Sequence, residues 1–315
     1  MSVVLLTAIG SASALSVMDS LRGLGHRVAG CNIYPQSWNV ESTLVDAFFQ
    51  ALPVTDEEAY LNQMEQAVLR EKVEYLIPLT DVEVDVLCAQ KARFARLGCT
   101  VCTPDEPHVR LMRNKQDMAQ ALASAGVCHT IPTCSPYGLS PKAEDFPMIL
   151  KPCSGRSSQG LQIVRNQESF RAALSLRQDY IGQPYLEGDI FTVDVARDLY
   201  GGVQTLARQE LLRTVNGLGT TVRIWPEHPL NDICAAIAGL IGLVGVVNME
   251  FICHQGEYYF LEVNPRFSGG AGFSRAAGVD FAALELTCHQ GDMIGPRPKV
   301  EGMVLTRRTD ITRTE

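Results

Sequence analysis

Apolar and polar residues alternate in blocks along the first hundred residues. An apolar run at Val3–Thr7 is typical of a buried strand, Ala14–Leu24 has helical spacing, and Arg27–Ile33 returns to strand-like residues. The pattern continues with a helix, a strand, a helix and a strand, at Glu57–Lys72, Tyr75–Leu79, Glu83–Leu97 and Cys99–Cys102. Because strands separated by helices of this length pair in parallel with right-handed crossovers, residues 1–105 predict an α/β domain with a parallel sheet.

Two apolar runs in the last third of the chain, Val246–Cys253 and Tyr258–Val263, flank a polar tip with Gly256 and predict a β-hairpin. The length of the tip decides how the strands face each other. A loop with an odd number of residues would place Glu250 directly across from Glu262, whereas a two-residue turn would put them on opposite faces. The residues of the tip leave both loop lengths open.

Polar side chains gather on one face of this hairpin. Side chains alternate along a strand, so Glu250 shares a face with Asn248, and Glu262 shares one with Asn264 and Arg266. Two facing carboxylates repel by up to about 1 kcal/mol unless positive charge lies between them. Because Mg²⁺ takes carboxylates, phosphates and other oxygen ligands, the hairpin predicts a divalent metal site. A solvated polar face is the alternative.

A glycine- and serine-rich loop at 154–160 joins two predicted strands, Phe146–Lys151 and Leu161–Val164. Because it joins strand to strand and lacks Gly-Lys-Ser/Thr, it is not a Walker loop. Its backbone N–H groups could still cover a triphosphate, although an ordinary hairpin tip fits the same residues. A helix is predicted over 107–125, and Lys115 lies on it.

Two further features of the N-terminal segment leave alternatives open. The first strand leads to a loop with the single Gly10, and the second strand approaches its end at Asn32 rather than at an acid, so dinucleotide binding is only weakly indicated. After the third strand, Thr80 and Glu83 match a capping box. Alternatively, Glu83 or Asp85 receives a substrate amino group at the carboxyl end of the sheet.

Composition limits the class of protein. The chain has 315 residues, a net charge of −8 and a pI near 5.3, which argues against nucleic acid or anionic membrane as a partner. No signal peptide or transmembrane segment is expected. Ten scattered cysteines without metal-ligand spacing predict reduced thiols and a cytoplasmic protein.

The stretch Glu262–Gly270, preceded by Asn248–Glu250, resembles the metal-binding signature of the ATP-grasp superfamily. The likeness is nearest to the carbamoyl-phosphate-synthetase-like and amino-acid ligase branches, and it covers roughly residues 1–290. It implies that ATP binds with two Mg²⁺ (or Mn²⁺) ions, and that the arginine of the signature faces the phosphoryl group. By this match the metal ligands are Glu250, Glu262 and Asn264, and the arginine is Arg266.

The resemblance also implies a nucleotide site. It assigns Lys115 and Lys151 to the phosphates, and the glycine- and serine-rich loop to the β- and γ-phosphates through Ser158 and Gly160. Adenine would bind at backbone positions Gln183 and Leu186, with Asp189 as the first choice and Glu187 as the second choice for the ribose acid. An arginine would bind the γ-phosphate or the substrate carboxylate, and Arg208 is the candidate, since a solvent-facing role is about as likely for Arg213.

As a fold, the resemblance implies an α/β chain with a parallel-sheet pre-ATP-grasp domain at 1–105 and two α+β ATP-grasp subdomains at 106–183 and 184–315. As a function, it implies a ligase that joins a small carboxylate, such as an amino acid, to an amine through an acylphosphate. Carbamoyl-phosphate-synthetase-like activation of bicarbonate, a non-catalytic ATP-binding protein and an NAD-dependent oxidoreductase are the alternatives. Dimers are usual in the resembled family, and the sequence leaves the oligomeric state open.

Overall fold

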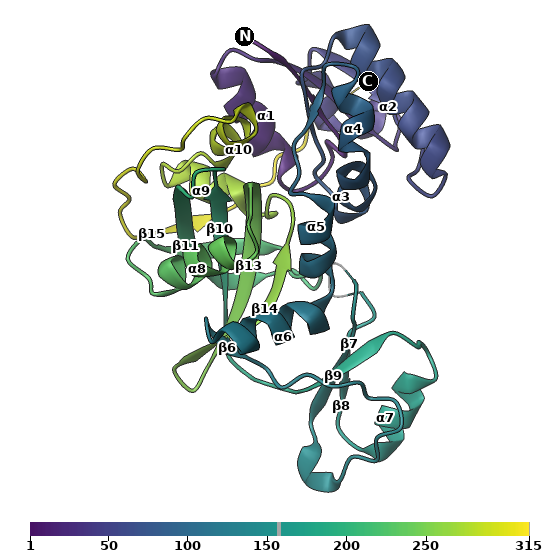
Figure 1. The fold of residues 1–315 in the computed structure, drawn as a ribbon, viewed down its shortest axis with the longest axis vertical. Coiled ribbons are helices and arrows are strands. Elements are labelled where there is room, and N and C mark those ends of the chain that lie inside the picture. Colours follow the sequence, from purple (N-terminus) through teal and green to yellow (C-terminus); the bar gives the residue numbers. More distant parts are fainter. Residues whose placement is uncertain (156–158, 315) are drawn as a thin grey trace.

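The structure is a computed structural model that describes residues 1–155 and 159–314. Among these residues the strands form three sheets, which lie one after another along the long axis of the molecule (Figure 1). The expected α/β class with a parallel N-terminal sheet is confirmed. The same residues include no helix long and apolar enough to span a membrane.

The N-terminal unit, residues 1–105, is built around a parallel sheet in the order β3-β2-β1-β4-β5. Its strands are β1 (Val3–Leu6), β2 (Arg27–Asn32), β3 (Ala47–Gln50), β4 (Tyr75–Ile77) and β5 (Thr100–Val101). Its helices are α1 (Ala14–Gly23), α2 (Glu57–Glu71), α3 (Asp81–Leu87) and α4 (Lys91–Ala95), with short 3₁₀ turns η1 (Gln36–Trp38), η2 (Val40–Thr43) and η3 (Cys88–Gln90). The sequence pattern did not predict β3, which is short and only half-buried.

Two predicted helices are interrupted in the structure. The segment predicted as one helix at Glu83–Leu97 is α3 and α4, separated by η3. The helix predicted at 107–125 is α5 (Glu106–Arg113) and α6 (Lys115–Ala125). Asn114 separates the second pair because its side chain accepts hydrogen bonds from two N–H groups of the next turn and begins a new helix there. Lys115 consequently opens a helix instead of lying in the middle of one.

The small sheet comprises the described strands β8-β7-β9 and is covered by α7 (Gln167–Leu174). Its strands are β7 (Met148–Pro152), β8 (Gln162–Val164) and β9 (Tyr180–Pro184), and the 3₁₀ turn η4 (Ala143–Asp145) precedes them. The loop from β7 to β8 is the glycine- and serine-rich segment, of which residues 156–158 lie outside the described residues. The sequence placed both strands of this hairpin correctly.

The large sheet has the order β15-β12-β11-β10-β13-β14-β6 and is antiparallel except where β6 joins β14. Its strands are β6 (His129–Thr130), β10 (Asp189–Arg197), β11 (Val203–Arg213), β12 (Gly219–Trp225), β13 (Gly245–His254), β14 (Glu257–Asn264) and β15 (Met303–Thr306). The remaining helices are α8 (Leu230–Leu240), α9 (Ala271–Ala276) and α10 (Phe281–Gln290).

The two faces of the large sheet differ in character. One face is apolar and buries Val193, Val247 and Met249 against helices α5, α6 and α8. The opposite face carries Asn248 and Glu250, which alternate with those apolar residues along β13. Because the helices cover the apolar face, the polar face is the one directed toward the N-terminal unit and the small sheet.

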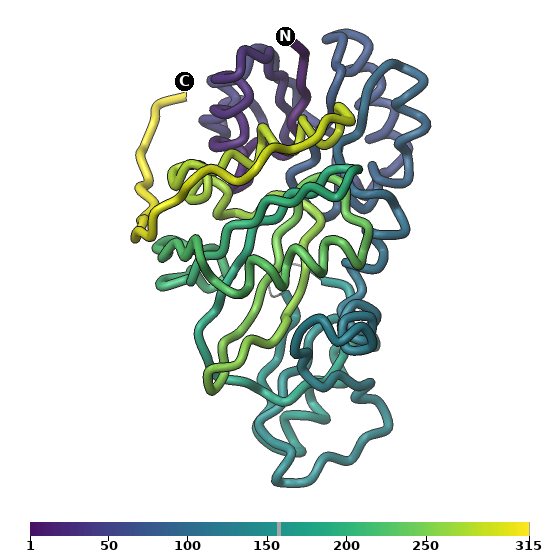
Figure 2. The backbone as a smooth tube through the Cα atoms, turned by 60° about the vertical axis from the view of Figure 1, so that its left-hand side comes forward, coloured from purple at the N-terminus to yellow at the C-terminus, as the bar shows by residue number. Residues whose placement is uncertain are grey.

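The C-terminal segment returns to the N-terminal unit. In Figure 2 the yellow end of the chain runs beside the purple N-terminal helices. Arg307 donates hydrogen bonds to the carbonyl groups of Ala12 and Gly269, and Thr314 donates one to Ser37. The large sheet and the N-terminal unit are therefore connected by the end of the chain as well as by α5. The division at residues 105 and 183 remains a prediction.

Candidate functional site

The hairpin of β13 and β14 turns tightly. His254 pairs with Glu257, so the tip is the two-residue turn Gln255–Gly256, and both of its residues have positive φ, 53° and 87°. The facing pair of acids therefore does not arise from an odd-numbered loop. Glu250 nevertheless lies across from Glu262, because the register shifts between Phe260 and Glu262. Leu261 is an extra residue, a β-bulge, that restores the facing pair.

Each acid of this pair already contacts a cation. Lys115 Nζ lies 3.3 Å from Glu262 Oε2, and Arg213 Nη2 lies 3.0 Å from Glu250 Oε2. Burial alone would raise the pKa of Glu262, but Lys115 and Lys151 together bring it below its ordinary value. Burial and the neighbouring Glu262 raise the pKa of Glu250. The two buried carboxylates therefore repel each other, and additional positive charge nearby would favour the ionised form of both.

Two lysines from different parts of the chain reach these acids. Lys115 begins α6, and its backbone N–H donates to Cys153 at the base of the glycine-rich loop. Lys151 lies near the end of β7 and is only 8% exposed. Its Nζ atom is 3.5 Å from the carbonyl oxygen of Leu261. Burial lowers the pKa of Lys151 to about 8. The structure thus brings both predicted lysines to the carboxylates.

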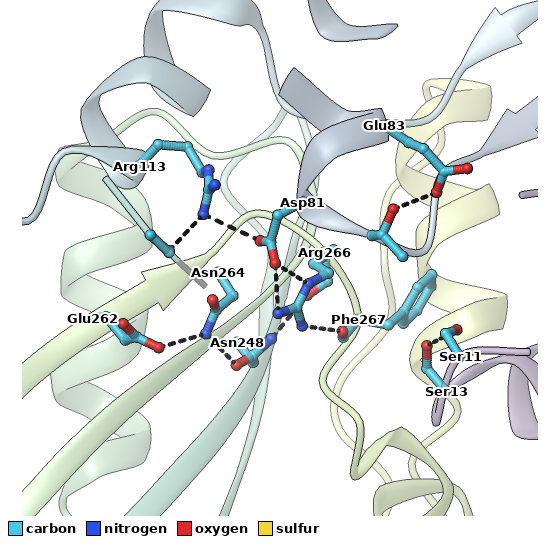
Figure 3. A network of polar contacts seen from close by, with 12 residues as sticks. Ser11, Ser13, Asp81, Glu83, Arg113, Asn248, Glu262, Asn264, Arg266 and Phe267 are labelled. Carbon is cyan, nitrogen blue, oxygen red and sulfur yellow. Dashed lines mark hydrogen bonds and ion pairs between the residues drawn. The ribbon is translucent and has the colours of Figure 1, made fainter. Parts of the chain in front are cut away.

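Arg266, Arg113 and Asp81 form a network, shown in Figure 3. Arg266 donates from Nε and Nη2 to one oxygen of the buried Asp81, at 3.0 and 2.9 Å. The other oxygen of Asp81 lies 3.4 Å from Arg113 Nη1. Arg113 also pairs with Asp85 and donates to the carbonyl of Gly155 in the glycine-rich loop. One carboxylate thus connects the N-terminal unit, α5 and the large sheet.

Arg208 lies on the same face but is enclosed. It is 2% exposed and donates to Asp194 at 2.7 Å, to Glu210 at 3.1 Å and to Ser268 at 3.0 Å. Its guanidinium forms part of the wall of the cavity, and its charge is balanced by the two acids. Arg213 is the more accessible arginine of β11, since its side chain is 27% exposed.

The predicted adenine-binding segment lies where β9 leads into the large sheet. Gln183 is buried, and its side chain donates to Thr133 at 2.7 Å. Leu186 and Glu187 line the cavity, whereas Asp189 lies outside the described lining and accepts a hydrogen bond from Gln209. Of the two acids predicted for the ribose, Glu187 therefore lies at the cavity and Asp189 does not belong to its described lining.

The remaining candidates from the sequence are two residues of the glycine- and serine-rich loop and Glu83 of the N-terminal unit. Gly160 has a φ of +77°, and its carbonyl accepts a hydrogen bond from Tyr180, whereas Ser158 lies outside the described residues. Glu83 is buried and hydrogen-bonded to Thr80 and to Tyr60, and burial raises its pKa. Its side chain is thus engaged within the N-terminal unit.

A cavity of about 1270 Å³ connects these residues. It extends from Gln183–Glu187, past Lys151 and the acid pair, to the loops after β1 and β2 of the N-terminal unit. No group of three or more His, Cys, Asp or Glu with metal-binding geometry occurs within residues 1–155 and 159–314. A cation here would consequently depend on two carboxylates, an amide and oxygens of a ligand.

Comparison with known proteins identifies the architecture. A family model described as "ATP-grasp in the biosynthetic pathway with Ter operon" matches residues 177–311, which include the acid pair and Arg266. This chain contains an ATP-grasp domain. The sequence-based resemblance to the ATP-grasp superfamily is thereby confirmed.

Relatives of this ATP-grasp chain include ligases and carboxylases. The carbamoyl phosphate synthase large chain of Thermoplasma acidophilum is 23% identical over 84% of this chain and 27% of that protein. D-alanine–D-alanine ligase of Fusobacterium nucleatum is 29% identical over 42% of this chain and 50% of that protein. The chain therefore spans half or less of the length of these curated relatives.

A solved structure shows the same ATP-grasp fold. N5-carboxyaminoimidazole synthetase from Staphylococcus aureus, complexed with ADP, has a TM-score of 0.76 and covers 97% of this chain and 82% of its own, at 15% identity. At this identity the likeness establishes the fold. The overall arrangement of helices and strands in this chain is therefore that of the synthetase structure.

Sequence reasoning missed two residues of the site and left a third undecided. Asp81 and Arg113 were not among the candidates from the sequence, because their contacts join segments far apart in the chain. Arg213 was an even choice between solvent and site. The signal for Asp81 was its position directly after a strand of a parallel sheet, where ligands collect.

Proposed function

We propose that this protein is an ATP-dependent carboxylate–amine ligase that acts through an acylphosphate on an amino acid or a similar small carboxylate. The observation that carries the proposal is the convergence of Glu250, Glu262 and Asn264 with Lys115 and Lys151 on one cavity of an ATP-grasp domain. Cations and ion-binding oxygens are the groups that a triphosphate requires.

The donor set fits Mg²⁺. Asn264 donates through Nδ2 to Asn248 and Glu262, which turns its carbonyl oxygen away from those contacts and leaves it available as a ligand. Glu250 and Glu262 each present carboxylate oxygens on the same face. When bound, the ions would neutralise charge on the phosphates. Lys115 and Lys151 would hold the phosphates beside them, as point charges of opposite sign.

The proposed reaction has two steps. A carboxylate oxygen of the substrate attacks the γ-phosphorus, the bond from phosphorus to the bridging oxygen breaks, and ADP leaves. The amine nitrogen then attacks the acyl carbon, loses a proton, and the bond from carbon to the phosphate oxygen breaks to release phosphate. Arg266 would face the transferred group, and Asp81 holds its guanidinium in place through two hydrogen bonds. Positioning and charge suffice, so no protein nucleophile is required.

The nucleotide would lie between the small sheet and the large sheet. Gln183, Leu186 and Glu187 line this end of the cavity, in support of adenine and ribose binding there. Ser158 and Gly160 are proposed to cover the phosphates. All ten cysteines, which lie in the described part of the chain, are free thiols, in agreement with a cytoplasmic location.

The proposal is tested by measuring ADP and phosphate release with Mg²⁺ and a panel of amino acids and amines. Glu262→Gln should reduce the rate by at least about 100-fold, since even groups behind a metal ligand contribute about 10–100-fold. The matched control is Glu257→Gln, the same change at the exposed start of β14. Wild-type turnover in Glu262→Gln would refute the metal assignment. Nucleotide binding without turnover across the panel would favour a non-catalytic ATP-binding protein.

Bicarbonate is the second candidate substrate. It is favoured by the alignment with a carbamoyl phosphate synthase over 84% of this chain. Activation of bicarbonate in place of an organic carboxylate would use the same phosphate groups. ADP release that depends on bicarbonate and ammonia, and on no member of the amino-acid panel, would select this alternative.

A further inference from the structure

The cavity has room for a second ligand beside a nucleotide. Its volume of about 1270 Å³ exceeds the ~300–1,000 Å³ that is usual for a single small-molecule site. The end away from Gln183–Glu187 is formed by loops of the N-terminal unit and by the loop between β11 and β12, residues 214–218. We call this end the acceptor compartment, and its chemistry indicates what the second ligand is.

The acids on the N-terminal wall of the acceptor compartment are already engaged. Asp81 holds Arg266 and Arg113, and Asp85 pairs with Arg113. Glu83 is 6% exposed and is hydrogen-bonded to Thr80. Among the described lining residues from 1–105 there is no Lys, Arg or His. This wall therefore offers neither an unpaired anion for an amine-bearing side chain nor a cation for a second carboxylate.

The remaining side chains of that wall are neutral and partly apolar. Ile33 and Tyr34 are 48% and 52% exposed although both are large and apolar, and both line the cavity with Val54. Tyr34 also stacks on Trp38 with ring centroids 6.0 Å apart, which extends the apolar surface outward. An exposed apolar surface inside a cavity marks a binding surface more often than a free one.

The opposite wall carries two arginines of β11, Arg208 and Arg213, of which Arg213 is the more exposed. Arg208 is balanced by Asp194 and Glu210 and is 2% exposed. Arg213 is paired only with Glu250 among the acids of the described residues, at 3.0 Å. Glu250 is one of the proposed metal ligands, so ion binding would draw its charge away from Arg213. One guanidinium would then be available for one carboxylate.

We infer that the acceptor compartment binds a small carboxylate whose side chain is uncharged and partly apolar, such as a neutral amino acid, and discriminates against amino acids with acidic or basic side chains. The inference rests on the proposed ligase function and deepens it by specifying the substrate class. A charged side chain in this compartment would lose its hydration without gaining a partner, and would bind more weakly for that reason.

The test compares ADP release with L-leucine and L-phenylalanine against L-glutamate and L-arginine, each at saturating Mg·ATP. The expected result is a kcat/KM at least about tenfold higher for a neutral member than for either charged one, a modest part of what an unpaired buried charge costs. A best substrate that is acidic or basic overturns the inference. Release with no member of the panel, while Mg·ATP still binds, also counts against it.

A variant pair locates the effect. Val54→Asp adds a charge to the compartment and should lower kcat/KM for the best neutral amino acid about tenfold or more while the Kd for Mg·ATP is unchanged. Val304→Asp is the matched control, because Val304 is 54% exposed on β15 and does not line the cavity. Equal activity of Val54→Asp and wild type, with wild-type thermal stability, would refute the compartment.

These outcomes separate the inference from the function beneath it. Absence of Mg·ATP binding in the unmodified protein would remove the proposed ligase itself. Binding and turnover that prefer glutamate or arginine would leave the ligase in place and remove only the substrate class. Because Val54 lies in the N-terminal unit, its substitution leaves the acid pair and both lysines unaltered.

Discussion

At the scale of single residues, environment decides what each charged side chain can do. Lys151 is nearly enclosed, and burial lowers its pKa to about 8, so its proton is held loosely until an anion arrives. Arg208 is equally enclosed but has two carboxylate partners. The first residue is suited to bind a ligand, and the second to hold its own strands together.

Lys151 gives the proposed nucleotide complex a pH dependence. A bound phosphate raises the pKa of the ammonium, so above pH 8 the protein must take up a proton to bind. Affinity for ADP should therefore fall as pH rises through and above about 8, by up to about tenfold per unit. Calorimetry in buffers of different ionisation enthalpy measures the proton uptake. An unchanged pH profile in Lys151→Met would contradict the assignment.

Arg208 should matter for stability. Arg208→Met leaves Asp194 and Glu210 buried without their cation, which is expected to lower the free energy of unfolding by about 3–5 kcal/mol. Arg213→Met, on the same strand but with a side chain that is 27% exposed, should cost less than about 1 kcal/mol. Urea denaturation of both variants measures the difference. Equal losses in the free energy of unfolding would show that the buried ion pairs of Arg208 contribute no more to stability than the pair of Arg213.

At the scale of elements, the decisive features are extra residues within strands. Leu261 is a bulge in β14, and β11 has a register shift between Glu210 and Leu212. Arg213 is five positions after Arg208, so strict alternation would place the two side chains on opposite faces. Both nevertheless line the cavity. Without these shifts, strict alternation would turn Glu262 and Arg213 away from the site.

The register of this hairpin predicts the results of two changes in it. Insertion of Gly-Ser between Gln255 and Gly256, at the exposed tip, should leave Mg²⁺-dependent nucleotide binding unchanged. Deletion of Leu261 should also leave that binding largely unchanged, because regular pairing from the turn then places Glu262 directly across from Glu250. Titration of each variant with Mg·ADP measures the affinity. Loss of nucleotide binding after the deletion would show that the bulge itself is required, and not only the pairing of the two acids.

These elements also show which features of the fold and the site can be predicted from the sequence. Hydrophobic periodicity located most helices and strands, and the motif around Glu262 identified the site, because both are local patterns. Bulges have no such signature, since Leu261 is an ordinary strand residue. The same holds for Asn114, whose capping role divided a predicted helix. Contacts such as that of Asp81 with Arg266 join positions 185 residues apart, beyond any local pattern.

At the scale of the whole molecule, the site is assembled from every part of the chain. Asp81 comes from the N-terminal unit, Lys115 from α6, Lys151 from the small sheet, and Glu250 and Glu262 from the large sheet. Arg113 connects Asp81 to Gly155 of the glycine-rich loop, so the arginine network spans the three sheets (Figure 3). Activity should therefore depend on residues that touch no phosphate.

Asp81→Asn tests this dependence. Removal of its charge should lower kcat about tenfold or more by loosening Arg266, while the Kd for ADP is retained, since both lysines are unchanged. Asp85→Asn is the control, because Asp85 is 42% exposed and pairs with Arg113 rather than Arg266. Steady-state kinetics and calorimetry separate the two effects. Similar kinetics in both variants would argue against Asp81 as a positioning residue.

The distribution of the two lysines has a consequence for reading genomes. The region matched by the family model, residues 177–311, contains both acids but neither Lys115 nor Lys151. A truncated gene that retained only this stretch would still be recognised by that model, and its product would lack the groups proposed to hold the phosphates. Among sequences that this family model matches, the presence of lysines at the positions of Lys115 and Lys151 should therefore separate active proteins from inactive ones.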